Sequence, residues 1–418
     1  MTRPAGMPPA AVARAAAAPL LGPAVAADRG RIGAARGVQG DRRIRVLHLI
    51  STLEAGGTEL AMIRLIRSLD PMAYRFRVAW LRGEPALLRE VEAATDGRPV
   101  PIGLRAKADP GALLRLCRLV RQECFDIVHT HMDLADYYGA AAARLLGTAL
   151  VSSKQNADEF RTRRTWKRTP FLLLERASYA AADAVIAVSQ GLVDFLEKAE
   201  ALPRHKTVVI GNGVDPAIAF KAPPRDEARR LLGLPPRVPV LGTAGRLAEQ
   251  KGQIDLLRAL PPIRAALPGA CLLIAGEGPL RGALEEEARR LGLGEAVRFL
   301  GHRKDILSVL KSLDLFVLPS LWEGLPQALL EAMALSLPVV ATRCVGVAET
   351  VTDGATGRLV PPQDPEAIAR AAIEVLRDPT LGRRLGEAGR RVVLERHAQD
   401  KVAARVDRLY RDILERRR

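Results

Sequence analysis

Short apolar runs rich in β-branched residues alternate with longer helical stretches from residue 43 onward, and this alternation most constrains the possible fold. The first series contains "IRVLHLI", "FRVAWL", "DIVHTH", "DAVIAVS" and "TVVIGNG". After a proline-rich patch at 215–237 the alternation resumes with "VPVLGTAGR", "CLLIAGEG", "VRFLGH", "DLFVLPS" and "PVVATRC". Continuous apolar strands separated by helices predict parallel sheets that are covered by helices on both faces.

Two such series predict an α/β protein with two Rossmann-like, doubly wound parallel-sheet domains that face each other across a cleft. We expect the first domain to span residues 43–214 and the second to span 215–397. Residues 398–418 are expected to form a helix that crosses back to the first domain. Residues 1–42 are rich in Ala, Pro and Arg and have no apolar periodicity, which predicts a disordered tail. Ligands of open parallel sheets bind at the carboxyl ends of the strands, so the site is expected in the cleft.

The composition excludes several classes of protein. The net charge of +16 is concentrated in residues 1–45, 161–176 and 401–418, whereas a nucleic-acid-binding protein would gather it on one folded face. No apolar run reaches the ~18 residues of a membrane-spanning helix, and prolines interrupt the one stretch that resembles a signal peptide. The four cysteines are scattered without a Cys-x-x-Cys pair, which is typical of reduced thiols in a cytosolic protein.

The stretch "GTAGRLAEQKGQ" follows a predicted strand of the second domain. Gly245 allows the backbone to approach a ligand closely, while Arg246 and Lys251 offer a planar fork and a point charge for phosphate oxygens. Two cations beside a glycine turn suit a diphosphate, although they also fit surface charges that flank a helix. The nearby Gly276-Glu277-Gly278 lacks the third glycine of a dinucleotide fingerprint and more often marks a tight turn.

The stretch "SLWEGLPQALLEAMALSLP" places two carboxylates eight positions apart. Glu323 precedes a predicted helix, near the backbone amides of Gly324 and Leu325, which can form an anion site. Glu331 lies within the apolar helix, where a carboxylate is costly unless it is paired or bonded to a polar group. A ribose diol would satisfy it, and so would a salt bridge to an arginine elsewhere in the chain.

In the first domain, "STLEAGGTEL" joins a strand to a helix through Gly56 and Gly57. Such a turn can approach a phosphate or a sugar, and the Thr58-Glu59 that follows is compatible with a capping box. In "DIVHTH" the two histidines point to the same face of a strand. We interpret His129 as a core residue and His131, at the end of the strand, as a cleft residue. No metal-binding constellation accompanies them.

Taken together, these motifs resemble glycosyltransferase family 4 (glycosyl transferases group 1), whose members are retaining enzymes of the GT-B fold that use nucleotide sugars. The resemblance covers roughly residues 44–415. Its marks are the following: Gly56-Gly57-Thr58-Glu59, His131, "VIGNGVD", Gly245-Arg246 with Lys251, "AGEGP" and the pair Glu323/Glu331.

The resemblance implies an acceptor-binding first domain and a second domain that binds the nucleotide sugar. Arg246 and Lys251 would hold the donor diphosphate, and Glu331 would bond the ribose hydroxyls. Glu323 would bind the donor sugar, while His131 would line the reacting face. The implied catalytic set is His131, Glu323, Arg246 and Lys251, and the donor-binding set adds Gly56, Gly57, Gly245, Gly324, Leu325 and Glu331.

The residues agree with a metal-independent transfer. Charge builds on the leaving diphosphate when the sugar–phosphate bond breaks, and fixed cations can stabilise it in place of a metal ion. The chain contains no Asp-x-Asp pair, which serves metal-dependent glycosyltransferases. We therefore expect no metal and no cofactor, a UDP- or GDP-sugar donor, and a glycan or a lipid-linked acceptor. A nucleotide-sugar epimerase and a non-catalytic sugar-nucleotide-binding subunit are the alternatives.

Two regions bear on the acceptor. Lys154, Gln155 and Asn156 stand where many relatives carry a histidine, on the side expected to face the acceptor. The segment 161–176 mixes basic residues with Trp166, Phe171 and leucines. It fits either a contact with an anionic membrane surface or a basic loop followed by a buried helix. The expected location is the cytoplasm, and the first of these two interpretations adds peripheral attachment to the inner face of the membrane.

Overall fold

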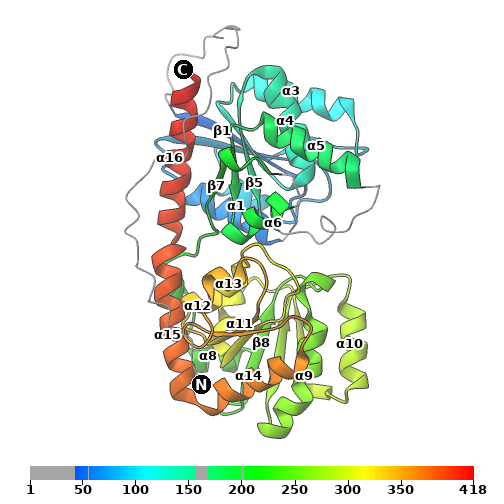
Figure 1. Cartoon of the computed structure of the whole chain (residues 1–418), viewed down its shortest axis with the longest axis vertical. Helices are drawn as coiled ribbons and strands as arrows, with labels where there is room; N and C mark the ends of the chain where they lie inside the picture. The colour runs from blue at the N-terminus through cyan, green and yellow to red at the C-terminus, as the bar shows by residue number, and fades with distance from the viewer. Residues whose placement is uncertain (1–42, 55, 157–167, 199–201) are drawn as a thin grey trace, which may run out of the picture.

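The computed structural model describes residues 43–54, 56–156, 168–198 and 202–418, and these form two α/β domains stacked end to end (Figure 1). Each domain is built on one all-parallel sheet with helices on both faces. The predicted fold class is confirmed. The predicted tail, residues 1–42, lies outside the described residues.

The first sheet has seven strands in the order β3-β2-β1-β4-β5-β6-β7. The strands are β1 Ile44–Ile50, β2 Tyr74–Trp80, β3 Val100–Pro101, β4 Ile127–His131, β5 Ala149–Lys154, β6 Ala184–Ala187 and β7 Thr207–Val209. Its helices are α1 Gly57–Ser68, α2 Leu88–Glu92, α3 Pro110–Gln122, α4 Asp133–Leu146, α5 Arg168–Ala181 and α6 Gln190–Lys198. The central position of β1, between β2 and β4, brings the ends of β1 and β4 side by side.

The second sheet has six strands in the order β10-β9-β8-β11-β12-β13. The strands are β8 Val240–Ala244, β9 Cys271–Ala275, β10 Val297–Gly301, β11 Leu315–Leu318, β12 Val339–Thr342 and β13 Arg358–Val360. Its helices are α7 Ile218–Lys221, α8 Arg225–Leu231, α9 Gln253–Ala266, α10 Arg281–Arg290, α11 Ile306–Ser312, α12 Gln327–Ala334, α13 Val347–Thr350, α14 Pro365–Arg377 and α15 Pro379–Arg396. In chain order, β8, β9 and β10 extend to one side of the sheet, and β11, β12 and β13 extend to the other. The topological switch point, where the strand order reverses, therefore lies between β8 and β11.

The last helix, α16 (Gln399–Arg417), leaves the second domain and packs along the first (Figure 1). Val402, Val406, Leu409, Tyr410 and Ile413 are buried in the same cluster as the apolar side chains of β1, β2 and α1. α16 is therefore a structural layer of the first domain.

The two places where the chain crosses between the domains are hydrogen-bonded to each other. The amide of Val214 donates to the carbonyl of His397 (2.8 Å), and the amide of Gln399 donates to the carbonyl of Val214 (2.9 Å). Gly213 leaves the space that this contact needs, because a Cβ there would lie 2.2 Å from the Gln399 side chain. The two crossings between the domains therefore lie side by side and hold each other in place.

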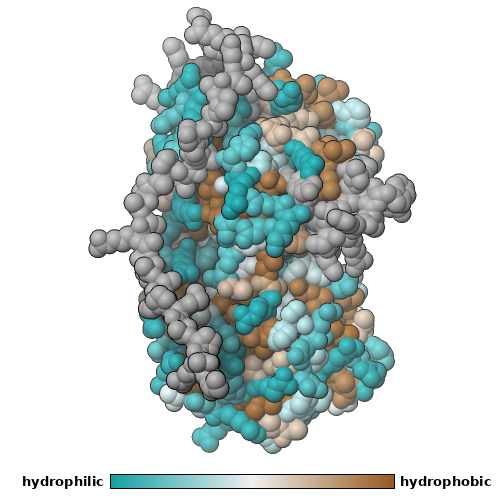
Figure 2. All heavy atoms as spheres, viewed as in Figure 1, coloured by the Kyte–Doolittle hydropathy of each residue, from teal (hydrophilic) through white to brown (hydrophobic). Residues whose placement is uncertain are grey.

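Among the described residues, no helix combines the length and the apolarity needed to cross a bilayer. Hydrophobic and hydrophilic residues are interspersed over both domains on the face shown in Figure 2. The four cysteines are free thiols; Cys271 is buried, Cys117 and Cys344 are half-buried, and Cys124 is exposed, so they are not all core residues.

Candidate active site

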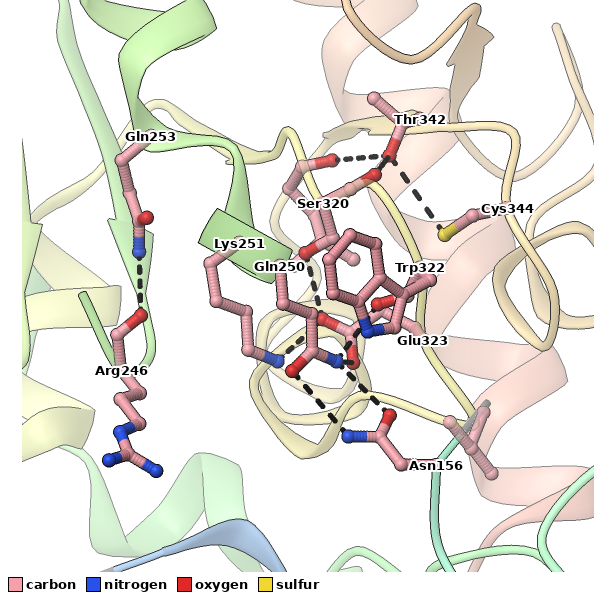
Figure 3. A network of polar contacts seen from close by, with 12 residues as sticks. Asn156, Arg246, Gln250, Lys251, Gln253, Ser320, Trp322, Glu323, Thr342 and Cys344 are labelled. Carbon is pink, nitrogen blue, oxygen red and sulfur yellow. Dashed lines mark hydrogen bonds and ion pairs between the residues drawn. The ribbon is translucent and has the colours of Figure 1, made fainter. Parts of the chain in front are cut away.

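An ion pair between Lys251 and Glu323 lies at the end of the second sheet that faces the first domain. Lys251 ends a short 3-10 turn after β8, and Glu323 lies in the loop between β11 and α12. The Lys251 Nζ is 2.5 Å from the Glu323 Oε1, and the Ser320 hydroxyl donates to the same oxygen (2.7 Å). Figure 3 shows these side chains converging. Because the Glu323 side chain is only 4% exposed, the pair is a fixed and largely desolvated dipole.

Arg246 follows β8 after one residue, Gly245, and is exposed. Its carbonyl accepts a hydrogen bond from Gln253 (3.0 Å), while its guanidinium extends away from the Lys251–Glu323 pair (Figure 3). The positive charge of Arg246 acts on Glu59 in α1. Burial raises the pKa of Glu59, and the guanidinium of Arg246 is one of the groups that partly oppose that rise. Arg246 is therefore a cation of the second domain placed toward the glycine turn of the first.

The loops after β8 and β9 are packed backbone against backbone. Gly245 and Gly276 both have positive φ, 156° and 138°. A Cβ on Gly276 would lie 1.9 Å from the Gly245 carbonyl oxygen, and one on Gly278 would lie 2.4 Å from that of Leu247. The Gly-x-Gly of this stretch is thus required for loop packing, in agreement with its interpretation as a tight turn.

Glu331 is paired across the domains. This carboxylate of α12 is 5% exposed, and its Oε1 lies 2.5 Å from a guanidinium nitrogen of Arg64 in α1. The sequence left two partners open for Glu331, a ribose diol and an arginine, and the structure shows the arginine. A ribose that bonded Glu331 would have to share the carboxylate with Arg64 or displace it.

The loop that precedes α12 touches the first domain. A Cβ on Gly324 would lie 2.1 Å from the Gln155 carbonyl oxygen, and the carbonyl of Leu325 accepts a hydrogen bond from Asn212 (2.9 Å). Pro326 is the N-cap residue of α12 and has extended backbone angles. The amides of Gly324 and Leu325 therefore lie at the domain interface, beside Glu323.

The glycine turn of the first domain caps α1 without a side chain. Gly56 is the N-cap, and Glu59 folds back so that its carboxylate occupies the space of a Gly56 Cβ and accepts from Thr52 (3.3 Å). Helix α1 thus begins without a side-chain cap, and the Glu59 carboxylate contacts Gly56 and Thr52 where a capping box was considered. Gly57 is exposed, and a Cβ there would meet no atom within 4 Å, so the turn has room for a ligand.

His131, at the end of β4, belongs to a cluster of three buried imidazoles with His129 and His48. His131 Nε2 lies 2.9 Å from His48 Nδ1. His129 is bonded through both ring nitrogens, to Tyr410 of α16 (2.6 Å) and to Ser153 (2.7 Å), as expected of a core residue. Burial lowers the pKa of all three, that of His131 to about 3, so the rings are neutral.

The three imidazoles are close enough to share a metal ion, since one nitrogen of each lies within 4.8 Å of the others. Their arrangement favours ring stacking over coordination of a metal ion. The His129 and His131 rings are 4.4 Å apart and tilted by only 27°, so their in-plane lone pairs do not converge. Both His129 nitrogens are also occupied. We interpret the cluster as a hydrogen-bonded stack.

These histidines make the stability of the first domain depend on pH. An unfolded histidine has a pKa near 6.5, whereas the folded rings stay neutral, so the unfolded chain binds more protons below that value. The stabilisation is complete above pH ~6.5 and falls as the pH drops toward ~3, by up to about 4 kcal/mol per pH unit if three protons bind on unfolding. Urea unfolding at several pH values measures this slope.

The matched variants are His131→Asn, which should reduce the slope by about one third, and His205→Asn, at an exposed position, which should leave it unchanged. An unaltered slope in His131→Asn would show that this ring does not contribute.

Two further contacts were not found from the sequence. Asn156 of the first domain and Gln250 of the second form an amide pair (3.1 Å), and Gln250 also donates to the Trp322 carbonyl (2.9 Å), beside Glu323 (Figure 3). Lys154, expected near the acceptor, is instead buried between Asp136 (3.4 Å) and Glu175 (3.3 Å). Gln155 and Asn156 are thus the residues of this stretch that face the second domain.

Cys344 lies behind Glu323, within 4.0 Å of the Thr342 hydroxyl. Burial, followed by the charge of Glu323, raises the pKa of its thiol to about 12, so it stays protonated. This cysteine does not serve as a nucleophile beside the Lys251–Glu323 pair.

Both halves of the chain match known families. Residues 224–392 match "Glycosyl transferases group 1" and residues 55–218 match "Glycosyltransferase Family 4". This chain is 31% identical to EpsF of Bacillus subtilis (strain 168), which is named as a glycosyltransferase. The match covers 300 residues, which are 71% of this chain and 78% of that protein. The UDP-Gal:alpha-D-GlcNAc-diphosphoundecaprenol alpha-1,3-galactosyltransferase of Escherichia coli is 31% identical over 282 residues, 65% of this chain and 72% of that enzyme.

Solved structures share the architecture. Anabaena Alr3699/HepE in complex with UDP and glucose superposes with a TM-score of 0.78 at 22% identity, over 88% of this chain and 100% of that one. WaaG, a glycosyltransferase involved in lipopolysaccharide biosynthesis, superposes with a TM-score of 0.70 at 16% identity, over 88% of this chain and 99% of that one. At these identities the likeness shows the fold.

Proposed function

Since the chain belongs to glycosyltransferase family 4 and has the GT-B fold, we propose that it is a retaining, metal-independent enzyme that transfers a sugar from a nucleoside diphosphate to a glycan or lipid-linked acceptor. The observation that carries the proposal is the desolvated Lys251–Glu323 pair at the domain interface. Arg246, just after the end of β8, adds a second cation. UDP and UDP-glucose complexes of HepE support a nucleotide-sugar donor.

The cations would act on the leaving group. Lys251 has three N–H donors, so it can keep Glu323 and still donate to a phosphate oxygen. Arg246 offers a planar fork to the diphosphate. As the sugar–phosphate bond breaks, negative charge grows on the phosphate oxygens, and donors fixed in a dry site stabilise it without reorganising. In a retaining transfer the acceptor hydroxyl attacks from the face that the phosphate leaves, and a phosphate oxygen can take its proton.

The carboxylates would orient the donor. Lys251 and Ser320 donate to Oε1 of Glu323, whereas Oε2 has a long contact with Gln250 (3.5 Å) and can also accept a hydroxyl of the sugar. Glu331 would bond the ribose hydroxyls in competition with Arg64. Gly57, with open space at its Cα, would let the first domain approach the donor.

The acceptor side would meet a membrane. Leu173 and Leu174 of α5 are 59% and 46% exposed, and the name of the E. coli relative includes a diphosphoundecaprenol acceptor. We infer peripheral attachment to the cytoplasmic face, which cosedimentation with anionic vesicles tests. Of the segment 161–176 that was expected to contribute, residues 161–167 lie outside the described residues.

A thermal-shift panel of UDP-, GDP- and ADP-sugars tests the donor. A donor at 100 times its Kd stabilises the folded protein by about 2.7 kcal/mol, so one base should raise the Tm and the others should not. Incubation of that donor with and without a lipid-linked acceptor, with EDTA in parallel, then tests the reaction. Conversion of the donor alone would indicate an epimerase, and loss of transfer with EDTA would contradict metal independence.

A further inference from the structure

His48 and His131 lie on neighbouring strands and their side chains meet on one face of the sheet. In the register of β1 and β4, His48 is opposite His129, and Ile50 is opposite His131. The His48 Nδ1 to His131 Nε2 distance of 2.9 Å is that of a hydrogen bond. His48 is fully buried, whereas His131 lines a cavity of about 40 Å³ together with Gln155 and Gly211.

A neutral imidazole carries one N–H, so the contact between the rings has two possible arrangements. If His48 donates through Nδ1, its Nε2 is a bare lone pair, and the proton of His131 is on Nδ1. If His131 donates through Nε2, the proton of His48 is on its own Nε2. Within the described residues, neither His48 Nε2 nor His131 Nδ1 has a hydrogen-bond partner.

Each arrangement therefore leaves one N–H without a protein acceptor, and the two differ in where it lies. An unpaired N–H on His48 would be sealed in the core, which is costly and rare. The Nδ1 of His131 is buried as well, but its ring lines the cavity beside the domain interface, where a water or a ligand oxygen can accept the N–H. The first arrangement is favoured.

We propose that His48 is a positioning residue that donates to Nε2 of His131 and so holds the tautomer in which His131 presents an Nδ1–H donor to the bound substrate. The role of His131 as a substrate contact rests on the proposed function, whereas the tautomer does not. His129 cannot take over, because Ser153 and Tyr410 occupy its nitrogens; it stacks on His131 and limits the tilt of that ring.

The tautomer can be read directly by NMR of the full-length protein labelled with 15N-histidine. The chain has six histidines, and His131→Asn and His48→Asn assign the two signals of interest. We expect His131 to be protonated on Nδ1 and bare on Nε2 in the unliganded protein. A proton on His131 Nε2 would overturn the proposal. This outcome does not depend on turnover, so a failure of the proposed function remains distinguishable.

Two substitutions test the consequence for transfer. His48→Phe keeps an aromatic ring without a donor, and His48→Asn places an amide near the position of Nδ1. We expect His48→Phe to lower kcat roughly 10- to 100-fold with little change in the donor KM, less than the 10²–10³-fold loss of a donor that binds the reacting oxygen itself. We expect His48→Asn to recover most of that loss.

Thermal melts first establish that both variants fold, and His205→Asn, at an exposed histidine, is the control that should leave kcat and the His131 signal unchanged. Equal kcat values for folded His48→Phe and wild type would overturn the proposal. If His48→Phe does not fold, the comparison of His48→Asn with wild type and the NMR measurement decide it: an Nε2-protonated His131 in either protein would contradict the role of His48.

Discussion

Replacing Lys251 with alanine should lower the rate of sugar transfer by about 10²–10³-fold, because a donor aimed at developing negative charge in a dry site contributes that much to kcat. The Lys251 side chain is 21% exposed and its partner Glu323 only 4%, so water replaces the lost ammonium poorly. A steady-state assay of nucleotide release measures the effect. The same variant should bind the nucleoside diphosphate more weakly while its affinity for the nucleoside is unchanged.

The comparison of the two ligands separates a lost phosphate contact from a general distortion of the site, which would weaken both. Arg370→Ala is the control, since Arg370 lies on α14 in an exposed pair with Glu366 and should leave transfer intact. A Lys251→Ala protein that keeps more than about one tenth of the wild-type rate would contradict the leaving-group role.

Replacing Lys154 with methionine should cost about 3–5 kcal/mol of unfolding free energy, because it leaves buried carboxylates without their cation. Lys154, Asp136 and Glu175 have side chains only 5%, 2% and 7% exposed. Hydroxyls of Thr130 and Ser152 donate to Asp136, so the carboxylate is held in place when the ammonium is removed. Urea unfolding measures the loss.

Arg98→Met is the matched control, because Arg98 is 90% exposed in its pair with Glu92 and should cost less than about 1 kcal/mol. High salt should reduce the small effect at Arg98 and leave the large one at Lys154. A loss below about 1 kcal/mol for Lys154→Met would mean that the two carboxylates are protonated or rehydrated in the variant.

The sequence predicted what depends on local pattern. Apolar runs identified five strands in each sheet but missed β3, β5 and β13. The glycine turns and the Glu323 loop were found because they follow strands that were identified. The partners of these residues were harder to predict. Arg64 lies 267 positions before Glu331 and pairs with it only because the domains face each other. Nothing in "GTELAMIRL" marks that arginine as different from a solvated one.

His48 was missed for a different reason. It stands in the middle of "IRVLHLI", where a single histidine is usually a core residue, whereas ligand-binding residues of parallel sheets are expected at strand ends. The strand order of a doubly wound sheet places β1 beside β4, so the same-face relation of His48 and His129 could have been derived. Lys154 was misplaced because its acidic partners come from α4 and α5, outside the motif.

The position of α16 has a consequence for biosynthesis. Residues 43–209 leave the ribosome before the second domain does, but one layer of their core is supplied by Val402 to Ile413, which follow that domain in the chain. The second domain can therefore reach its native packing while the first still exposes the apolar face of β1, β2 and α1. The nascent chain completes its two domains in reverse order, and removing α16 would leave the core of the first domain without one of its layers.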